Sequence, residues 1–338
     1  MTTSGGSDAG ARPLVKVLGV GGTIAMKYDP ESHGYVPALT EEDLLALVPG
    51  LDGLARVESA QFTNIPSDWI TPEIWLQLSA AVNRELERPE VSGVVITHGT
   101  DTLEETAYFL SLTVLSPKPV VITGAQRTVS ETDFDGPRNL GDSIRVAADP
   151  ASVDRGTLVV FDGKIFAADT VYKCHTNRLD AFSGGEYGAL GDLFLKSVRY
   201  RRGPQGRPEP FDVRDRETLP KVEVFHLYPG ADADLLRGCA DRGAAGVVVQ
   251  GFGAGNLSET VYEALKDLTA REVAVVVSTV VARGGIVPMY SFAGGGQTTK
   301  ALGAYSAGLL TTNKARIMLM VCLAVDASGE LARRYLAW

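Results

Sequence analysis

Apolar residues along the chain form two short runs, each followed at once by a glycine-threonine turn. Residues 94–96 lack the polar alternation of a half-exposed strand, which predicts a strand buried on both faces of a parallel sheet. In the polar turn that follows, Thr100 or Asp101 is placed to cap a helix that the apolar spacing predicts through Phe109. Residues 14–24 repeat this order of strand and turn. Two such turns at the carboxyl ends of buried strands predict a ligand site at the switch point of an open α/β sheet.

Further periodic segments surround these two turns. Helical spacing predicts helices that begin after Thr40 and Thr71 as caps. The expected helices are residues 41–48, 72–86 and 139–149, and the expected strands are residues 119–123, 156–161 and 169–176. Residues 25–39 contain Gly and Pro without a period, which predicts an irregular loop of the length typical of lids and binding loops.

The pattern changes after this first unit. Residues 200–220 are rich in Arg, Gly, Pro and Asp and predict an interdomain linker. Strand patterns follow at residues 221–227, 246–250 and 273–279, separated by helical patterns. The predicted fold class is α/β. We expect a disordered tail at residues 1–13, a large amino-terminal domain with an open twisted sheet at 14–199, and a smaller carboxy-terminal α/β domain at 221–338.

Composition excludes several classes of function. A length of 338 residues exceeds one comfortable hydrophobic core, in agreement with two domains. The net charge of -9 and the lack of a basic stripe argue against nucleic-acid binding, and no stretch has the length of a membrane span. Three cysteines and four histidines without ligand spacing argue against a metal site and favour reduced thiols. Because the tail also lacks the apolar core of a secretory signal, we expect a soluble, cytoplasmic protein.

Three motifs in the chain place threonine near the ends of expected strands, and the first two combine it with glycine. They are Gly21-Gly22-Thr23-Ile24-Ala25, His98-Gly99-Thr100-Asp101-Thr102 and Thr170-Val171-Tyr172-Lys173. In this order and spacing they resemble the bacterial-type L-asparaginase/glutaminase family, and the resemblance covers nearly the whole chain after the tail. It implies a two-domain α/β hydrolase, without metal or organic cofactor, that deamidates L-asparagine to L-aspartate and ammonia through a threonine-linked acyl-enzyme.

The resemblance also implies the catalytic roles. Thr23 would be the nucleophile with Tyr35 of the loop beside it, and Thr100, Asp101 and Lys173 would form a second catalytic group. A threonine hydroxyl needs a neighbouring base or proton relay at neutral pH. Either Tyr35 or the Thr100-Lys173 pair can supply that relay, and the sequence leaves both open.

Substrate-binding roles follow from the same resemblance. Ser67 and Asp68 would hold the α-carboxylate and α-amino groups of the substrate together with Asp101. Backbone N–H groups of the glycine turns, that of Gly22 among them, are natural donors to an oxyanion. Asn256 matches a residue that in the family reaches the site of a neighbouring subunit, which implies a homodimer or homotetramer.

One segment departs from the family pattern. Some members carry a glutamate where this chain has the glycine-rich residues 293–297, so no acidic residue meets the α-amino group there. A looser grip on that group favours some glutaminase activity, and a mixed glutaminase-asparaginase is one alternative. The amidase subunit of a tRNA-dependent amidotransferase would need an additional amino-terminal domain. A catalytically inactive amino-acid-binding protein is disfavoured because all five expected catalytic positions are filled.

Overall fold

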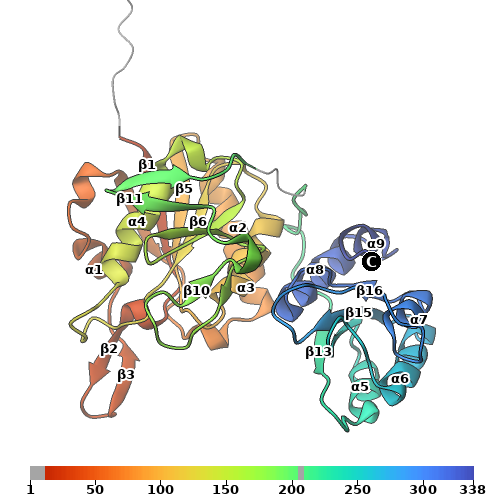
Figure 1. Cartoon of the computed structure of the whole chain (residues 1–338). Coiled ribbons are helices and arrows are strands. Elements are labelled where there is room, and N and C mark those ends of the chain that lie inside the picture. Colours follow the sequence, from red (N-terminus) through yellow and green to blue (C-terminus); the bar gives the residue numbers. More distant parts are fainter. Residues whose placement is uncertain (1–11, 205–208) are drawn as a thin grey trace, which may run out of the picture.

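The computed structural model describes residues 12–204 and 209–338 and contains two α/β domains (Figure 1). The large domain is built on an eight-stranded sheet of order β12-β11-β8-β7-β6-β5-β1-β4. Its strands are β1 Leu14–Gly19, β4 Arg56–Gln61, β5 Val91–Thr97, β6 Val120–Thr123, β7 Thr157–Phe161, β8 Lys164–Ala167, β11 Gly191–Phe194 and β12 Ser197–Tyr200. The five strands β4, β1, β5, β6 and β7 are parallel, while β8, β11 and β12 pair antiparallel, so the sheet is mixed. The expected tail lies outside the described residues except for its last two.

Helices cover both faces of this sheet. On one face lie α2 (Pro72–Glu87) and α3 (Leu103–Thr113), and on the other lie α1 (Glu41–Ala46) and α4 (Gly136–Ala148). Val94 belongs to the first core and Val95 to the second, and both are fully buried. Burial on both faces is the physical reason why this strand shows no polar alternation.

Most helix starts agree with the capping signals, and one does not. Thr40 forms a capping box with Asp43 at the start of α1, and the Thr71 hydroxyl accepts the backbone N–H of Ile74 in α2. The expectation that Thr100 or Asp101 caps α3 is wrong. Thr102 is the cap residue, and its hydroxyl donates to the carbonyl of Ser67 instead of bonding the helix.

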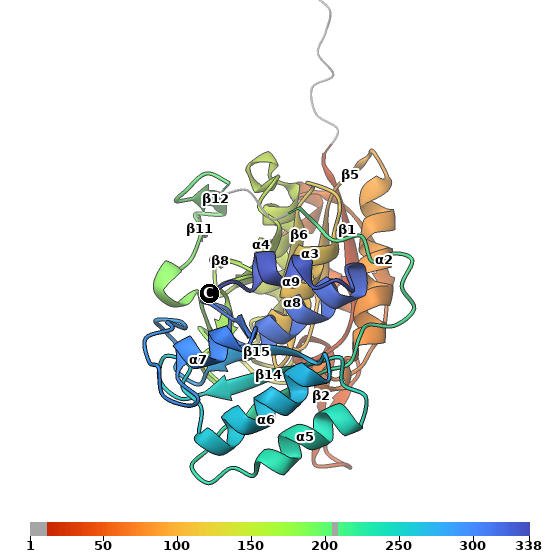
Figure 2. The same cartoon turned by 90° about the vertical axis from the view of Figure 1, so that its right-hand side faces the viewer.

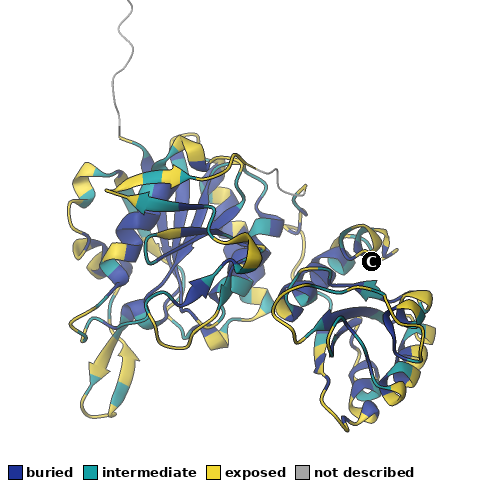
Figure 3. Ribbon diagram, viewed as in Figure 1, coloured by how far each residue is buried: buried dark blue, intermediate teal, exposed yellow. Residues whose placement is uncertain are grey.

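Residues 25–39 are not an irregular loop. They form a β-hairpin of β2 (Met26–Asp29) and β3 (Gly34–Pro37), which extends from the large domain (Figure 1) and is largely exposed (Figure 3). The Asp29 carboxylate accepts the N–H groups of Glu31 and Ser32 and shapes the turn. Neither face of the hairpin packs on a core. The four residues of β2 alternate between apolar and charged, but those of β3 do not, so the pattern did not predict a hairpin.

The strand expected over residues 169–176 is also much shorter in the structure. Tyr172–Lys173 forms β9 and pairs with β10, Phe182–Ser183. Before β9 the backbone turns, because Val171 donates its N–H to the carbonyl of Ala167. After β9 the His175 side chain accepts the N–H groups of residues 177 and 178, which turns the chain again.

The small domain has a four-stranded parallel sheet of order β13-β14-β15-β16. Its strands are β13 Val222–His226, β14 Gly246–Gly251, β15 Ala274–Thr279 and β16 Tyr305–Ser306. Its helices are α5 Ala233–Asp241, α6 Glu259–Ala270, α7 Gly296–Ala301, α8 Thr312–Val325 and α9 Glu330–Tyr335. The three strands expected from the sequence are present, and β16 is an additional one.

Helix α8 joins the two domains. It lies between the small sheet and α3 of the large domain (Figures 1 and 2), and one apolar cluster contains Ile317 and Met318 of α8 together with Trp75 and Phe109 of the large domain. Because α8 has apolar neighbours on both sides, its residues 317–322 are all buried, and this part of the helix lacks a polar face. No helix in the described part of the chain is long and apolar enough to cross a membrane.

Candidate active site

The two glycine turns lie side by side because the strands that precede them are neighbours. β1 and β5 are parallel with Gly19 opposite Thr97, while β4 lies on the other side of β1, so the chain changes direction across the sheet here. Gly22 has φ 89°, and a Cβ on it would lie 2.1 Å from the Cα of Gly99. The two backbones touch, which excludes any larger residue at position 22 and brings Thr23 and Thr100 to one opening.

A cavity of about 330 Å³ occupies this opening, at the lower end of the size range of small-ligand pockets. Its walls are mainly hydroxyl, amide and charged groups. The lining residues are Thr23, Met26, Tyr35, Thr100, Asp101, Gln126, Thr128, Glu131, Lys173, Thr176 and Asn177. The structure therefore brings together the five side chains that the sequence nominated for catalysis.

Lys173 is held between the two acceptor groups of the second turn. Its Nζ donates to Thr100 Oγ1 at 2.8 Å and to Asp101 Oδ1 at 2.7 Å. Its backbone N–H donates to the carboxylate of Glu104 in the first turn of α3. Thr100 is almost fully buried, whereas the Asp101 side chain is mostly exposed. A hydroxyl bonded to an amine at this distance has the geometry for proton transfer.

The other two residues nominated for catalysis, Thr23 and Tyr35, are less buried than Thr100. Thr23 begins a single 3-10 turn and is half-buried. Tyr35 stands on the exposed hairpin with its ring edge against Tyr28, at 5.7 Å between centroids. The hairpin is bonded to the loop after β6 through the Tyr28 N–H, which donates to Ser130 Oγ at 2.9 Å.

Three of the residues expected to bind substrate, Ser67, Asp68 and Asn256, do not line the cavity. Ser67 is buried beside the second turn, where a Cβ on Gly99 would lie 2.7 Å from its Oγ, and Asp68 is exposed. Neither lines the cavity. Asn256 lies in the small domain, where its backbone pairs with that of Phe252, and it does not line the cavity of its own chain.

Sequence reasoning missed the third part of the cavity wall. Gln126, Thr128 and Glu131 come from the loop after β6, and Thr176 and Asn177 follow β9. The buried Asp135 carboxylate orders this loop by accepting the N–H groups of residues 126 and 127, and burial raises the pKa of Asp135. β6 is the next parallel strand after β5, so the rule that identified the first two turns applied to its carboxyl end as well.

Two buried titratable residues, Glu41 and His98, form hydrogen bonds at the end of β5 and the start of the second turn. Glu41 accepts a hydrogen bond from Thr97 Oγ1 at 2.7 Å, and burial raises the pKa of Glu41 to about 7. His98 is fully buried, and burial lowers the pKa of His98 to about 4. Its Nδ1 lies 2.7 Å from the carbonyl of Gly99, which can only accept, so Nδ1 carries the proton and Nε2 accepts from Thr106 at 3.0 Å.

The fold and the site together define a class. Two hydroxyl-bearing residues line one polar cavity at the carboxyl ends of the parallel strands, and one of them is bonded to a lysine. On a two-domain α/β fold, this arrangement is typical of a hydrolase with a hydroxyl nucleophile. Among the residues that the structure describes, no group of three His, Cys, Asp or Glu side chains is placed to hold a metal ion.

Comparison with known proteins gives the family. A model of the asparaginase amino-terminal domain matches residues 14–206, and a model of the glutaminase/asparaginase C-terminal domain matches residues 221–336. The chain is 39% identical over 327 residues to a probable L-asparaginase of Deinococcus radiodurans, covering 95% of this chain and 96% of the relative. It is 33% identical over 334 residues to a probable periplasmic L-asparaginase of Haemophilus influenzae, covering 97% and 94%.

A solved structure agrees with these relatives. The crystal structure of a probable cytoplasmic L-asparaginase from Campylobacter jejuni superposes with a TM-score of 0.86 at 33% identity, covering 96% of this chain and 99% of that one. The chain belongs to the bacterial-type L-asparaginase family and is a hydrolase that acts on an amide.

Proposed function

We propose that this protein is an L-asparagine amidohydrolase that works through a threonine-linked acyl-enzyme. The observation that carries the proposal is the convergence of Thr23 and the bonded Thr100-Lys173-Asp101 group on one small polar cavity. The names of the relatives support asparagine as the substrate.

In the first half-reaction, Thr23 Oγ1 attacks the side-chain amide carbon of asparagine. The hydroxyl proton passes to the relay, and backbone N–H groups of the glycine turns, including that of Gly22, stabilise the oxyanion. The C–N bond then breaks, and the relay returns the proton to the leaving nitrogen so that ammonia departs. Water attacks the resulting threonine ester in the second half-reaction, which releases aspartate and restores the Thr23 hydroxyl.

Two groups can serve as the relay, and their geometry differs. The Thr100-Lys173 pair is fixed by two hydrogen bonds of the Lys173 side-chain nitrogen, whereas Tyr35 approaches from the exposed hairpin. We assign the proton transfer to the Thr100-Lys173 pair. Thr100 takes the proton of Thr23 and gives its own proton to Lys173, which acts in this step as the neutral amine. The reason for this assignment is that a relay must keep its atoms at hydrogen-bond distance throughout the reaction.

The proposed clamp on the substrate uses the rim of the cavity. The Asp101 carboxylate is exposed on this rim and suits the positively charged α-amino group. Ser67 packs against Gly99, next to Thr100, so a substrate that extends past Thr100 reaches Ser67 and the adjacent Asp68.

The substrate is tested by measuring the specificity constants for asparagine and glutamine in one preparation. The extra methylene of glutamine moves its amide past Thr23, and one methylene is worth about 10- to 200-fold in discrimination. We expect asparagine to be preferred within this range and glutamine to be hydrolysed detectably, since residues 293–297 offer no acidic side chain to tighten the clamp. Equal constants would identify a mixed glutaminase-asparaginase, and binding without ammonia release would identify an inactive binding protein.

We also propose that a second copy of the chain completes the site. Asn256 does not line the cavity of its own chain, so a role in the site requires another subunit. Apolar side chains are exposed on the same domain, at Val280, Val281, Val287, Met289, Tyr290 and Phe292. A stable interface of this kind buries more than about 1,000 Å². Sedimentation tests the proposal, and full activity from a monomer would contradict it.

For the location of the protein, we propose the cytoplasm. Cys174, Cys239 and Cys322 are all free thiols, as is usual in a reducing compartment. Cell fractionation with activity measurement tests this, and activity confined to the periplasmic fraction would contradict it.

A further inference from the structure

A lysine of the small domain is completely buried at the boundary between the domains. Lys314, in the first turn of α8, is 0% exposed. Its Nζ donates to the backbone carbonyl of Asp169 at 3.1 Å and to that of Val171, both in the large domain. The Tyr108 ring lies 5.9 Å from the same nitrogen. A buried ammonium group is tolerated only when such partners replace the water that it has lost.

Helix stability does not account for this lysine. The amino-terminal end of a helix carries a partial positive charge, so a cation in the first turn of α8 is unfavourable for the helix itself. Burial lowers the pKa of Lys314 to about 8, while the carboxylates of Glu104, Asp169 and Glu105 oppose that decrease. The side chain is therefore mostly an ammonium group at neutral pH, and its stabilising partners all belong to the large domain.

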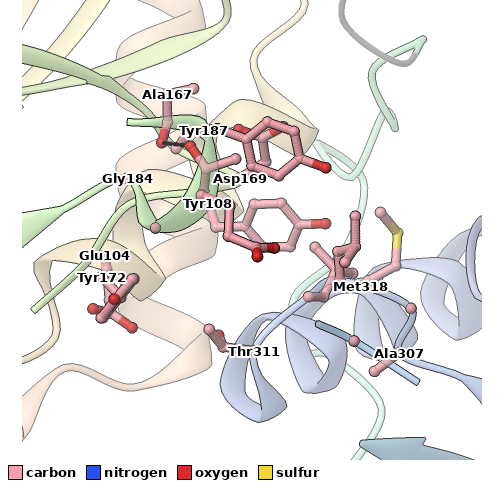
Figure 4. Close-up of a pocket in the computed structure, with 18 of the residues that line it drawn as sticks. Glu104, Tyr108, Ala167, Asp169, Tyr172, Gly184, Tyr187, Ala307, Thr311 and Met318 are labelled. Carbon is pink, nitrogen blue, oxygen red and sulfur yellow. Dashed lines mark hydrogen bonds between the residues drawn. The ribbon is translucent and has the colours of Figure 1, made fainter. Parts of the chain in front are cut away.

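The contacts of Lys314 lead directly to the active-site lysine. The Val171 carbonyl that it binds is two residues before Lys173. Glu104, whose charge acts on Lys314, accepts the backbone N–H of Lys173. Figure 4 shows Glu104, Asp169 and Tyr172 on the large-domain wall of a cavity of about 920 Å³, across from α8. The backbone that carries Lys173 is thus held at Val171 by Lys314 and at Lys173 itself by Glu104.

We propose that Lys314 is a positioning residue for the proposed reaction: by binding the carbonyls of Asp169 and Val171, it sets the reach of Lys173 to Thr100. The inference rests on the proposed function of Lys173. It gives the small domain a part in the site of its own chain, in addition to any contribution to a neighbour.

A neighbouring contact supplies a matched control. Asn313 Nδ2 donates to Glu105 Oε1 at 3.0 Å, so this residue also joins α8 to α3, but it does not touch the segment before Lys173. Asn313→Ala removes one interdomain hydrogen bond and leaves the carbonyl contacts of Lys314 in place. If weaker contact between the two domains is enough to lower activity, both variants show the loss. If the loss comes from displacement of Lys173, only the Lys314 variant shows it.

The experiment compares Lys314→Met, Asn313→Ala and wild-type protein by asparagine kinetics, thermal unfolding and amide hydrogen exchange. Misplacement of a reacting group costs up to about 10²-fold in rate. We expect Lys314→Met to lower kcat by about 10- to 100-fold with KM changed by less than about threefold, and to speed exchange in residues 169–174. Asn313→Ala should change neither kcat nor that exchange, even if both variants unfold at a lower temperature.

Several outcomes would overturn the proposal. Wild-type kcat in Lys314→Met, equal loss in both variants, or unchanged exchange of residues 169–174 would each do so. If Lys314→Met does not fold, Lys314→Gln is judged by the same criteria, and failure of both to fold would assign Lys314 to folding instead. Wild-type protein without asparaginase activity would contradict the proposed function, whereas the exchange measurement would still test the contact.

Discussion

The two walls of the cavity are built in different ways. On one side, Lys173 is bonded through its side chain to Thr100 and Asp101 and through its backbone to Glu104. On the other side, Tyr35 stands on a hairpin whose residues are mostly exposed. The first wall lies on the body of the large domain, and the second extends from it (Figure 3).

This difference separates two tasks. Proton transfer needs atoms held at fixed distances, which the Lys173 wall provides. Entry and release of substrate need a wall that can move, and a hairpin with little buried apolar surface has low local stability. We therefore expect substitutions in the first wall to affect kcat strongly and substitutions in the hairpin to affect it weakly. The predictions below test this contrast, beginning with the residue between the walls.

The largest effect on kcat is expected at Thr23, which lines the cavity together with Lys173 and Tyr35. Thr23→Ala should lower kcat by about 10⁴- to 10⁶-fold, because it removes the nucleophile of the acyl-enzyme pathway. Aspartate binding, measured by calorimetry, should remain nearly unchanged, since the hydroxyl takes part in chemistry more than in ground-state binding. Thr23→Ser is the matched control and should keep much of the activity. Near wild-type turnover in Thr23→Ala would exclude Thr23 as the nucleophile.

The next effect tests the fixed wall. Lys173→Met keeps the approximate length of the side chain but removes both hydrogen bonds to the second turn, so kcat should fall by about 10³- to 10⁴-fold. Steady-state kinetics on asparagine measure this loss. If the substitution merely raised KM, Lys173 would bind substrate and the relay would lie elsewhere.

A smaller effect is expected from the hairpin. Tyr35→Phe removes one hydroxyl from an exposed residue, and a hydrogen bond worth about 1 kcal/mol corresponds to about 5-fold in rate. The comparison with Lys173→Met under the same conditions decides which group activates Thr23. A greater loss in Tyr35→Phe than in Lys173→Met would reverse the assignment of the relay.

The smallest effect on kcat, but a clear effect on the free energy of unfolding, is expected at Glu41, which bonds Thr97 at the end of β5. Its folded-state pKa of about 7 exceeds the usual value of 4.5, so its contribution to stability is complete below pH 4.5 and is lost as the pH rises through 7. Glu41→Gln should therefore raise the free energy of unfolding at pH 8 by about 3 kcal/mol and leave it unchanged near pH 4.5. Urea unfolding at the two pH values measures this, and a gain at both would contradict it.

Local sequence determined the buried framework of the large domain. An unbroken apolar run such as residues 94–96 has few alternatives to a strand covered on both faces, and small polar residues directly after it must lie at the edge of the sheet. Thr40 likewise predicted the start of α1, because a capping box involves only residues three positions apart. These features depend on interactions within a few residues, so the order of residues alone contains them.

Tertiary structure decided what depends on distant partners. The hairpin of residues 26–37 has no buried face, and the alternation of β2 does not continue in β3, so its sequence did not distinguish it from a loop. Gln126 and Glu131 reach the cavity because β6 lies beside β5 in the sheet, which places their loop near the first two turns. Lys314 is one of two charged residues in a largely apolar helix, and only the packing of α8 on α3 brings its ammonium group to the backbone before Lys173. The physical reason is that an isolated segment specifies its own backbone preferences, whereas burial, charge pairing and the reach of a side chain are set by whichever segment folds against it.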